Sequence, residues 1–161
     1  MSDAVYPIPS RLVNSFVPIG EDNSEYRVTG KIKCECGNEL LEVYESNERQ
    51  LVKLICNKCG KEIMLFDAGK DGWDGFVCKM DHIDRKMPFN KVICSHCDSS
   101  LYSVITSIYS QGKQDFYDEC VSNDESFSIE DWVNGYEWIQ ITLNCGKCNA
   151  SEEQWLDLET M

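Results

Sequence analysis

The cysteines of this chain limit its fold more than any other feature, because eight of the ten form four close pairs. The pairs fall into two sets: Cys34, Cys36, Cys56 and Cys59, then Cys94, Cys97, Cys145 and Cys148. Two near neighbours on one tight turn, met by two more from a second turn, form the tetrahedral thiolate cage that Zn²⁺ prefers. The spacing therefore predicts two metal sites and two Zn²⁺ per chain, with iron as the alternative metal.

The residue after each pair supports the metal interpretation. These residues are Gly37, Gly60, Asp98 and Asn149, and their types tolerate a left-handed backbone best. A metal-binding turn needs that conformation so that backbone N–H groups can turn toward the sulfur atoms. The Cys34-x-Cys36 pair is one residue shorter than usual and is the least regular of the four.

Disulfide bonds in a secreted protein are the other common use of many cysteines. Residues 1–20 (MSDAVYPIPSRLVNSFVPIG) contain neither the basic region nor the apolar region of a cleavable signal. We therefore expect free thiolates in a reducing compartment, and a cytoplasmic protein. No stretch approaches about 18 consecutive apolar residues, so we expect no membrane partner.

The charge is strongly negative and unevenly distributed. The formal net charge is −13, and residues 1–91 hold 15 acids against 13 bases, a net of −2. Residues 92–161 hold 13 acids against Lys113 and Lys147 alone, a net of −11. Such a chain repels phosphate, so we expect no nucleic-acid partner. The acidic half favours a basic protein as partner.

The two halves look like diverged copies of one unit. Residues 37–43 after the first pair resemble residues 98–104 after the third, and residues 54–59 resemble residues 143–148. Alternating apolar and β-branched residues predict strands beside each pair. The expected strands are 26–34, 39–45, 51–56 and 62–67 in the first unit, and 91–94, 100–109, 136–145 and 153–158 in the second.

This arrangement resembles a tandem of zinc-ribbon (rubredoxin-like) modules, over about two thirds of the chain. The resemblance implies a mainly β fold of two modules built from short antiparallel strands. It implies little about function, because zinc ribbons serve many roles. The expected divisions are an N-terminal arm (1–25), module 1 (26–80), a linker (81–90), and module 2 (91–161) with an insertion at 107–140.

The insertion is the region where a binding function would be added to the scaffold. It holds eight acids against one lysine, together with seven of the seventeen aromatic residues. A capping box at Ser128 predicts a short helix that ends at Gly135. The aromatic residues either bind a partner or fill a small second core, and both readings stay open. The candidate partner-binding residues here are Trp132, Tyr136, Asp124, Glu125, Glu130 and Asp131.

Two weaker patterns remain. Residues 67–75 (DAGKDGWDG) do not match a calcium loop, because the twelfth position is Cys78. A tight turn that exposes Trp73 makes this tryptophan a further candidate partner contact. The other unassigned metal-ligating or nucleophilic residues are Cys78, Cys120, His82 and His96, and nothing in the sequence fixes their roles.

Three functions are compatible with these features. The first is a non-enzymatic protein–protein interaction module, for example an acidic inhibitor or neutraliser of a basic protein. The second is a rubredoxin-like iron protein that transfers electrons. The third is an enzyme that uses a metal-bound water or a cysteine thiol, although both sites look closed and a catalytic zinc needs an open position.

Overall fold

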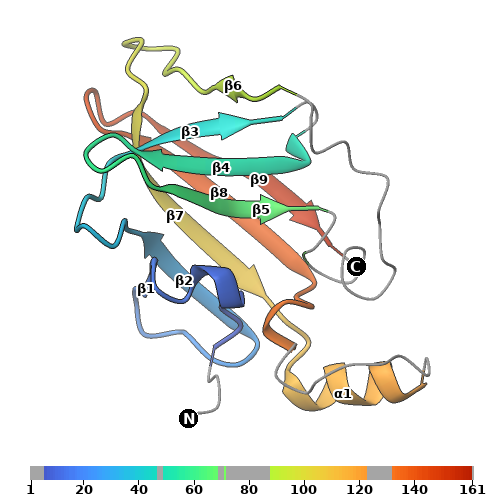
Figure 1. Cartoon of the computed structure of the whole chain (residues 1–161). Coiled ribbons are helices and arrows are strands. Elements are labelled where there is room, and N and C mark those ends of the chain that lie inside the picture. The colour runs from blue at the N-terminus through green and yellow to red at the C-terminus, as the bar shows by residue number, and fades with distance from the viewer. Residues whose placement is uncertain (1–5, 47–48, 69–70, 72–87, 123–131, 161) are drawn as a thin grey trace.

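The computed structural model describes residues 6–46, 49–68, 71, 88–122 and 132–160. These residues form one nine-stranded antiparallel sheet with a short 3₁₀ helix and an α-helix (Figure 1). The elements are η1 (Ser10–Leu12), β1 (Phe16–Pro18), β2 (Arg27–Ile32), β3 (Leu41–Glu45), β4 (Leu51–Cys56), β5 (Glu62–Asp67), β6 (Asn90–Lys91), β7 (Leu101–Tyr109), α1 (Lys113–Ser122), β8 (Trp138–Cys145) and β9 (Ser151–Glu159).

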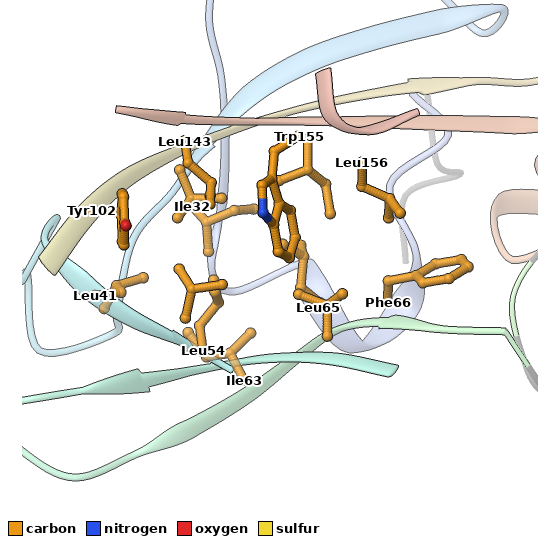
Figure 2. Close-up of a cluster of buried hydrophobic side chains, with 14 of the residues drawn as sticks. Ile32, Leu41, Leu54, Ile63, Leu65, Phe66, Tyr102, Leu143, Trp155 and Leu156 are labelled. Atoms are coloured by element: carbon orange, nitrogen blue, oxygen red, sulfur yellow. The ribbon is translucent and has the colours of Figure 1, made fainter. Parts of the chain in front are cut away.

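Strand β7 joins the two halves of the chain. Its residues 101–102 pair with β3 and its residues 105–109 pair with β2, both from the first half. Its residues 102–109 pair with β8, which in turn pairs with β9. The sheet curls into a half-barrel, and Figure 2 shows side chains of β3, β4 and β5 facing side chains of β8 and β9.

The interior of the curled sheet holds one large apolar core. Strands β2, β7 and β8 alternate strictly between buried and half-exposed or exposed positions, as expected for a sheet with one face covered. Both halves contribute side chains to this core (Figure 2): Leu41, Leu54, Ile63 and Leu65 from the first, Tyr102, Leu143, Trp155 and Leu156 from the second.

The prediction of a mainly β fold is confirmed, and the expected strands match observed ones closely except at 91–94, which shares only residue 91 with β6. The sequence did not reveal that strands from both halves join one sheet and one core. Two separate modules are therefore not what the described part of the chain shows. The domain boundaries at 26–80 and 91–161 stay predictions.

The segment expected as an N-terminal arm is part of the fold from its sixth residue. Strand β1 pairs with β2, and Leu12 and Phe16 are buried. The Arg11 guanidinium donates hydrogen bonds to both carboxylate oxygens of the buried Asp71. It also donates to the carbonyl oxygens of Met64 at 2.7 Å and Leu65 at 3.0 Å. The arginine thus fastens this segment to β5.

The insertion contains α1, which the sequence analysis did not predict. This helix buries Phe116 and Cys120, one turn apart, against Trp132 and Val133 in a small second core. The start of the helix predicted at Ser128 lies outside the described residues, as does most of the linker 81–90. Where the structure is described, no helix has the length and apolar character needed to cross a membrane.

Candidate metal centres

The first set of cysteines converges at one end of β4. The Sγ atoms of Cys34 and Cys59 are 3.4 Å apart, and those of Cys36 and Cys56 are 3.5 Å apart. All four lie within 4.8 Å of one another. Four sulfurs at about 2.3 Å from a central Zn²⁺ would be separated by about 3.8 Å, so the cluster fits a tetrahedral thiolate site.

The second set has the same arrangement. The Sγ atoms of Cys94 and Cys148 are 3.7 Å apart and those of Cys97 and Cys145 are 3.4 Å apart, again with all four within 4.8 Å. None of these separations is close to the roughly 2.05 Å of a disulfide bond, and all eight thiols are free. Each of the two sets could therefore hold one metal ion.

Each pair lies on a tight turn that is closed by backbone hydrogen bonds. The residues that follow the pairs have the predicted left-handed backbone, with φ of 98° at Gly37, 78° at Gly60, 62° at Asp98 and 62° at Asn149. Each donates its N–H to the carbonyl of the first cysteine of its pair, at 2.8 to 3.1 Å. The expectation from residue type is confirmed at all four turns.

The turns differ in length as the sequence indicated. The N–H groups of Cys56, Cys94 and Cys145 bond to the carbonyls of residues 61, 99 and 150, five positions later. The N–H of Cys34 bonds to the carbonyl of residue 38, four positions later. The missing residue of the Cys34-x-Cys36 pair therefore shortens the turn without displacing its sulfur atoms from the cluster.

Donor groups surround the sulfurs of both sites. The side-chain amide of Asn38 donates to Sγ of Cys56 at 3.3 Å in the first site. In the second site the backbone N–H groups of His96 and Lys147 donate to Sγ of Cys94 and Cys145, both at 3.4 Å. Such donors stabilise negatively charged sulfur, the form that ligates a metal.

Amide and backbone N–H donors lower the pKa of one cysteine in each site, while the pKa of a second cysteine is raised. The Asn38 amide, followed by the backbone N–H groups of Cys59 and Lys58, lowers the pKa of Cys56 to about 6. The backbone N–H groups of Cys148 and Lys147 lower the pKa of Cys145 to about 6. Burial, with hydrogen bonds from the neighbouring cysteines, raises the pKa of Cys34 to about 12. In each cluster one thiol is therefore more acidic than usual and another is less acidic, whereas metal binding requires every ligating cysteine to lose its proton.

The two sites are linked through the sheet itself. Cys56 pairs with Leu41 across β4 and β3, Leu41 pairs with Tyr102 across β3 and β7, and Tyr102 pairs with Cys145 across β7 and β8. A single row of neighbouring residues thus begins at one metal site and ends at the other. All four side chains of this row are buried on the inner face of the sheet.

Two of the candidate partner-binding aromatics are interior residues. Trp132 is 1% exposed and packs with α1, while Tyr136 is 0% exposed in the large core. Burial removes both side chains from the surface, as expected if the aromatics of the insertion fill cores. The remaining candidates, Trp73, Asp124, Glu125, Glu130 and Asp131, lie outside the described residues.

The unassigned cysteines and histidines gain little from the structure. Cys120 is a buried member of the α1 core, and His96 is exposed beside the second site. Neither joins a metal-ligating cluster among the residues that are described. Cys78 and His82 lie outside those residues. Asn38, which the sequence analysis missed, could have been suspected from its place directly after the first turn.

The fold and the two clusters define a mainly β protein with two four-cysteine sites suited to metal binding. Comparison of the chain with protein-family models, with curated proteins and with solved structures gave no match. The function must therefore be argued from the residues themselves.

Proposed function

We propose that this chain is a cytosolic zinc protein that acts as an interaction module for a basic protein. Each four-cysteine cluster holds one structural Zn²⁺, and the acidic second half supplies the binding surface. The observation that carries the metal part of the proposal is the convergence of eight free thiols into two clusters within 4.8 Å. The binding part depends on how the charges are arranged.

A structural role for the metal follows from the number of ligands. Four cysteine ligands satisfy a tetrahedral Zn²⁺ and leave no position for a water or a substrate. The row of residues between the sites supports the same role, because each metal would fasten strands that meet in one core. We therefore favour a non-enzymatic function over a metal-dependent reaction.

The acidic residues of the two halves have different surroundings. Every ion pair among the described residues takes its acid from positions 35 to 71, as in Glu35 with Lys61, Glu42 with Lys91 and Glu62 with Lys53. The exposed acids of β9, which are Glu152, Glu153, Asp157 and Glu159, form no ion pair within the described residues. A surface of unpaired carboxylates attracts a basic protein and speeds its association.

The metal content of protein purified without added metal tests the first part of the proposal. Two zinc ions per chain and a colourless solution are expected. Iron with visible absorbance would instead indicate the rubredoxin-like alternative, because ferric thiolate sites absorb visible light and Zn²⁺ sites do not. A third zinc ion would indicate a further site among Cys78, His82, His96 and Cys120, and would favour the enzyme alternative.

Capture experiments at two salt concentrations test the second part. A basic partner held by unpaired carboxylates should be released as the salt concentration rises, because screening weakens exposed charge interactions. Partners retained equally at low and high salt would contradict electrostatic binding. A Cys120→Ala variant tests the alternative of an enzyme that uses a thiol. Partner capture should be unchanged in this variant, and a lost phenotype would favour the enzyme alternative.

A further inference from the structure

A pocket opens on the outer face of the sheet, at the end where β7, β8 and β9 meet. Its volume is about 340 Å³, and it is lined by Tyr109, Glu137, Trp138, Gln140 and Glu159. Two aromatic rings and two carboxylates therefore surround one space. This combination does not occur in the lining of the other described pockets.

The strand register brings these side chains together. Tyr109 of β7, Trp138 of β8 and Glu159 of β9 are direct neighbours across the three strands. Gln140 lies two residues along β8 from Trp138, so both project from the same face. Glu137 precedes β8, and its backbone N–H bonds to the carbonyl of Tyr109 at 2.8 Å. The pocket is thus built mainly on regular strands rather than on a loop.

Hydrogen bonds hold the floor of the pocket in one arrangement. The Tyr109 hydroxyl donates to Oε1 of Gln140 at 3.2 Å, and Nε2 of Gln140 donates to Oδ1 of Asp157 at 3.2 Å. The indole Nε1 of Trp138 donates to the same Asp157 oxygen. A prearranged site binds more tightly because its side chains lose less freedom on binding.

The pocket has excess negative charge and is lined by two half-buried rings, Tyr109 and Trp138. Within the described ranges, Glu137 and Glu159 form no ion pair, and no lysine or arginine stacks on Trp138. Arg27 of β2 places its guanidinium 5.6 Å from the centre of the Tyr109 ring. This contact within the chain shows that the aromatic row can accept a guanidinium group.

We propose that this pocket binds a cationic side chain, preferably arginine, from a basic protein partner. The proposal rests on the function proposed above and names the point where that partner is anchored. A planar guanidinium can stack on an aromatic ring while it bonds to a carboxylate, which an ammonium does less well. Tyrosine and tryptophan beside unpaired carboxylates are also typical of the residues that dominate binding energy at interfaces.

Titration with a short basic peptide tests the proposal directly. The probe is acetylated, amidated tetra-arginine, with tetra-lysine for comparison, added to the zinc-loaded full chain. Binding is followed through the indole N–H signals of the four tryptophans, with Trp138 assigned from the spectrum of W138F. We expect the Trp138 signal to shift and saturate, with tetra-arginine the tighter ligand. A Trp138 signal that does not move would overturn the proposal.

Substitutions separate the pocket from general attraction to negative charge. Glu137→Gln with Glu159→Gln should weaken tetra-arginine binding by about tenfold, since both carboxylates are lost. The matched control is Glu152→Gln with Glu153→Gln, which removes the same charge from exposed positions at the other end of β9. The control should weaken binding less than twofold. Equal losses in the two double variants would contradict a specific pocket.

A third variant covers the aromatic part of the site. Trp138→Leu keeps a strand-compatible apolar residue at a half-buried position of β8 and should also weaken binding by about tenfold. Unchanged metal content and thermal midpoint would show that each variant is folded. A basic protein whose salt-sensitive binding survives all pocket substitutions would refute this inference while leaving the proposed function intact. A purified parent chain that contains no metal, yet binds tetra-arginine at Trp138, would refute the proposed structural zinc and leave the pocket inference intact.

Discussion

The two halves of the molecule build their metal sites alike and treat their surfaces differently. In each half, two tight turns present four thiols at nearly equal separations, and N–H groups donate to the sulfurs. In the first half, exposed glutamates such as Glu35 and Glu39 have lysine partners that hold their carboxyl pKa below its usual range. In the second half, Glu137 and Glu159 form no ion pair among the described residues.

This difference indicates which property each half contributes. The turn geometry that both halves share serves folding, because metal binding at such sites is coupled to folding. The ion pairs of the first half neutralise its surface, whereas the acids of the second half, which form no ion pair among the described residues, leave a field available to a partner. The same local unit can therefore be kept for stability in one place and changed for recognition in another.

The largest expected effect would come from breaking either metal site. Cys56→Ser and Cys145→Ser should each remove one metal per chain. Because both sites belong to one row of one sheet, each substitution should lower the stability of the whole chain, by on the order of 4 kcal/mol or more. Metal analysis and thermal unfolding measure both effects. Cys120→Ala is the control, since it should keep two metals.

The outcome of that experiment decides whether the halves are independent. A single transition that shifts in both serine variants is expected from the shared core. Two transitions, of which only one responds to each substitution, would show two separately folding modules instead. That result would restore the tandem arrangement expected from the sequence.

The next effect concerns the N-terminal segment, which only the first half carries. Arg11→Ala leaves the buried carboxylate of Asp71 without its partner and removes donors from two backbone carbonyls. We expect a loss of about 3–5 kcal/mol in the free energy of unfolding, measured with urea. Lys31→Ala, which removes an exposed ion pair with Glu39, should cost much less. Similar losses in both variants would contradict the structural importance of the Arg11 contacts.

A third experiment sharpens the comparison of the surfaces. A triple glutamine substitution of Glu137, Glu153 and Glu159 should weaken salt-sensitive binding of a basic partner by about tenfold, mainly because it removes both pocket carboxylates. The same substitution at Glu35, Glu39 and Glu62, whose charges are already paired with lysines, should change binding about twofold or less. Binding constants at two salt concentrations measure the difference. A larger loss of binding in the triple variant of Glu35, Glu39 and Glu62 would place the binding surface in the first half instead.

The smallest effect tests the turns. Gly37 has φ of 98° and open space around its missing Cβ, so Gly37→Ala adds backbone strain without a steric clash. We expect a loss of about 1–2 kcal/mol. Asn149→Gly relaxes the equivalent position in the second half and should change stability by about 0.5 kcal/mol or less. A stabilising Gly37→Ala would show that the left-handed turn is not needed there.

Local signals in the sequence predicted the parts of the fold that depend on neighbouring residues. The alternation in β2, β7 and β8 and the residue types after each cysteine pair are properties of short segments. The pairing of β2 with β7 joins residues about 80 positions apart, and no local pattern specifies it. Arg11 was missed for the same reason, because its partner Asp71 is 60 positions away.

The site was predictable to the same extent. Spacing was enough to assign all eight cysteines to two groups, because each turn brings its own pair together. Helix α1 was missed because its two buried residues, Phe116 and Cys120, lie among mostly charged and polar residues, which gives only a weak helical pattern. The aromatic pocket combines residues of three strands that meet only through the register of β7, β8 and β9. The composition of this region was evident before its arrangement was known.

The central place of β7 has a consequence for how the protein is made. Strands β2 and β3 both require β7 as a neighbour, yet the ribosome produces them some 60 to 80 residues earlier. A nascent chain that has already bound its first metal would still present two open strand edges, which favour aggregation. Fragments that end before residue 101 should therefore precipitate or require a chaperone, even when their four cysteines are fully metallated.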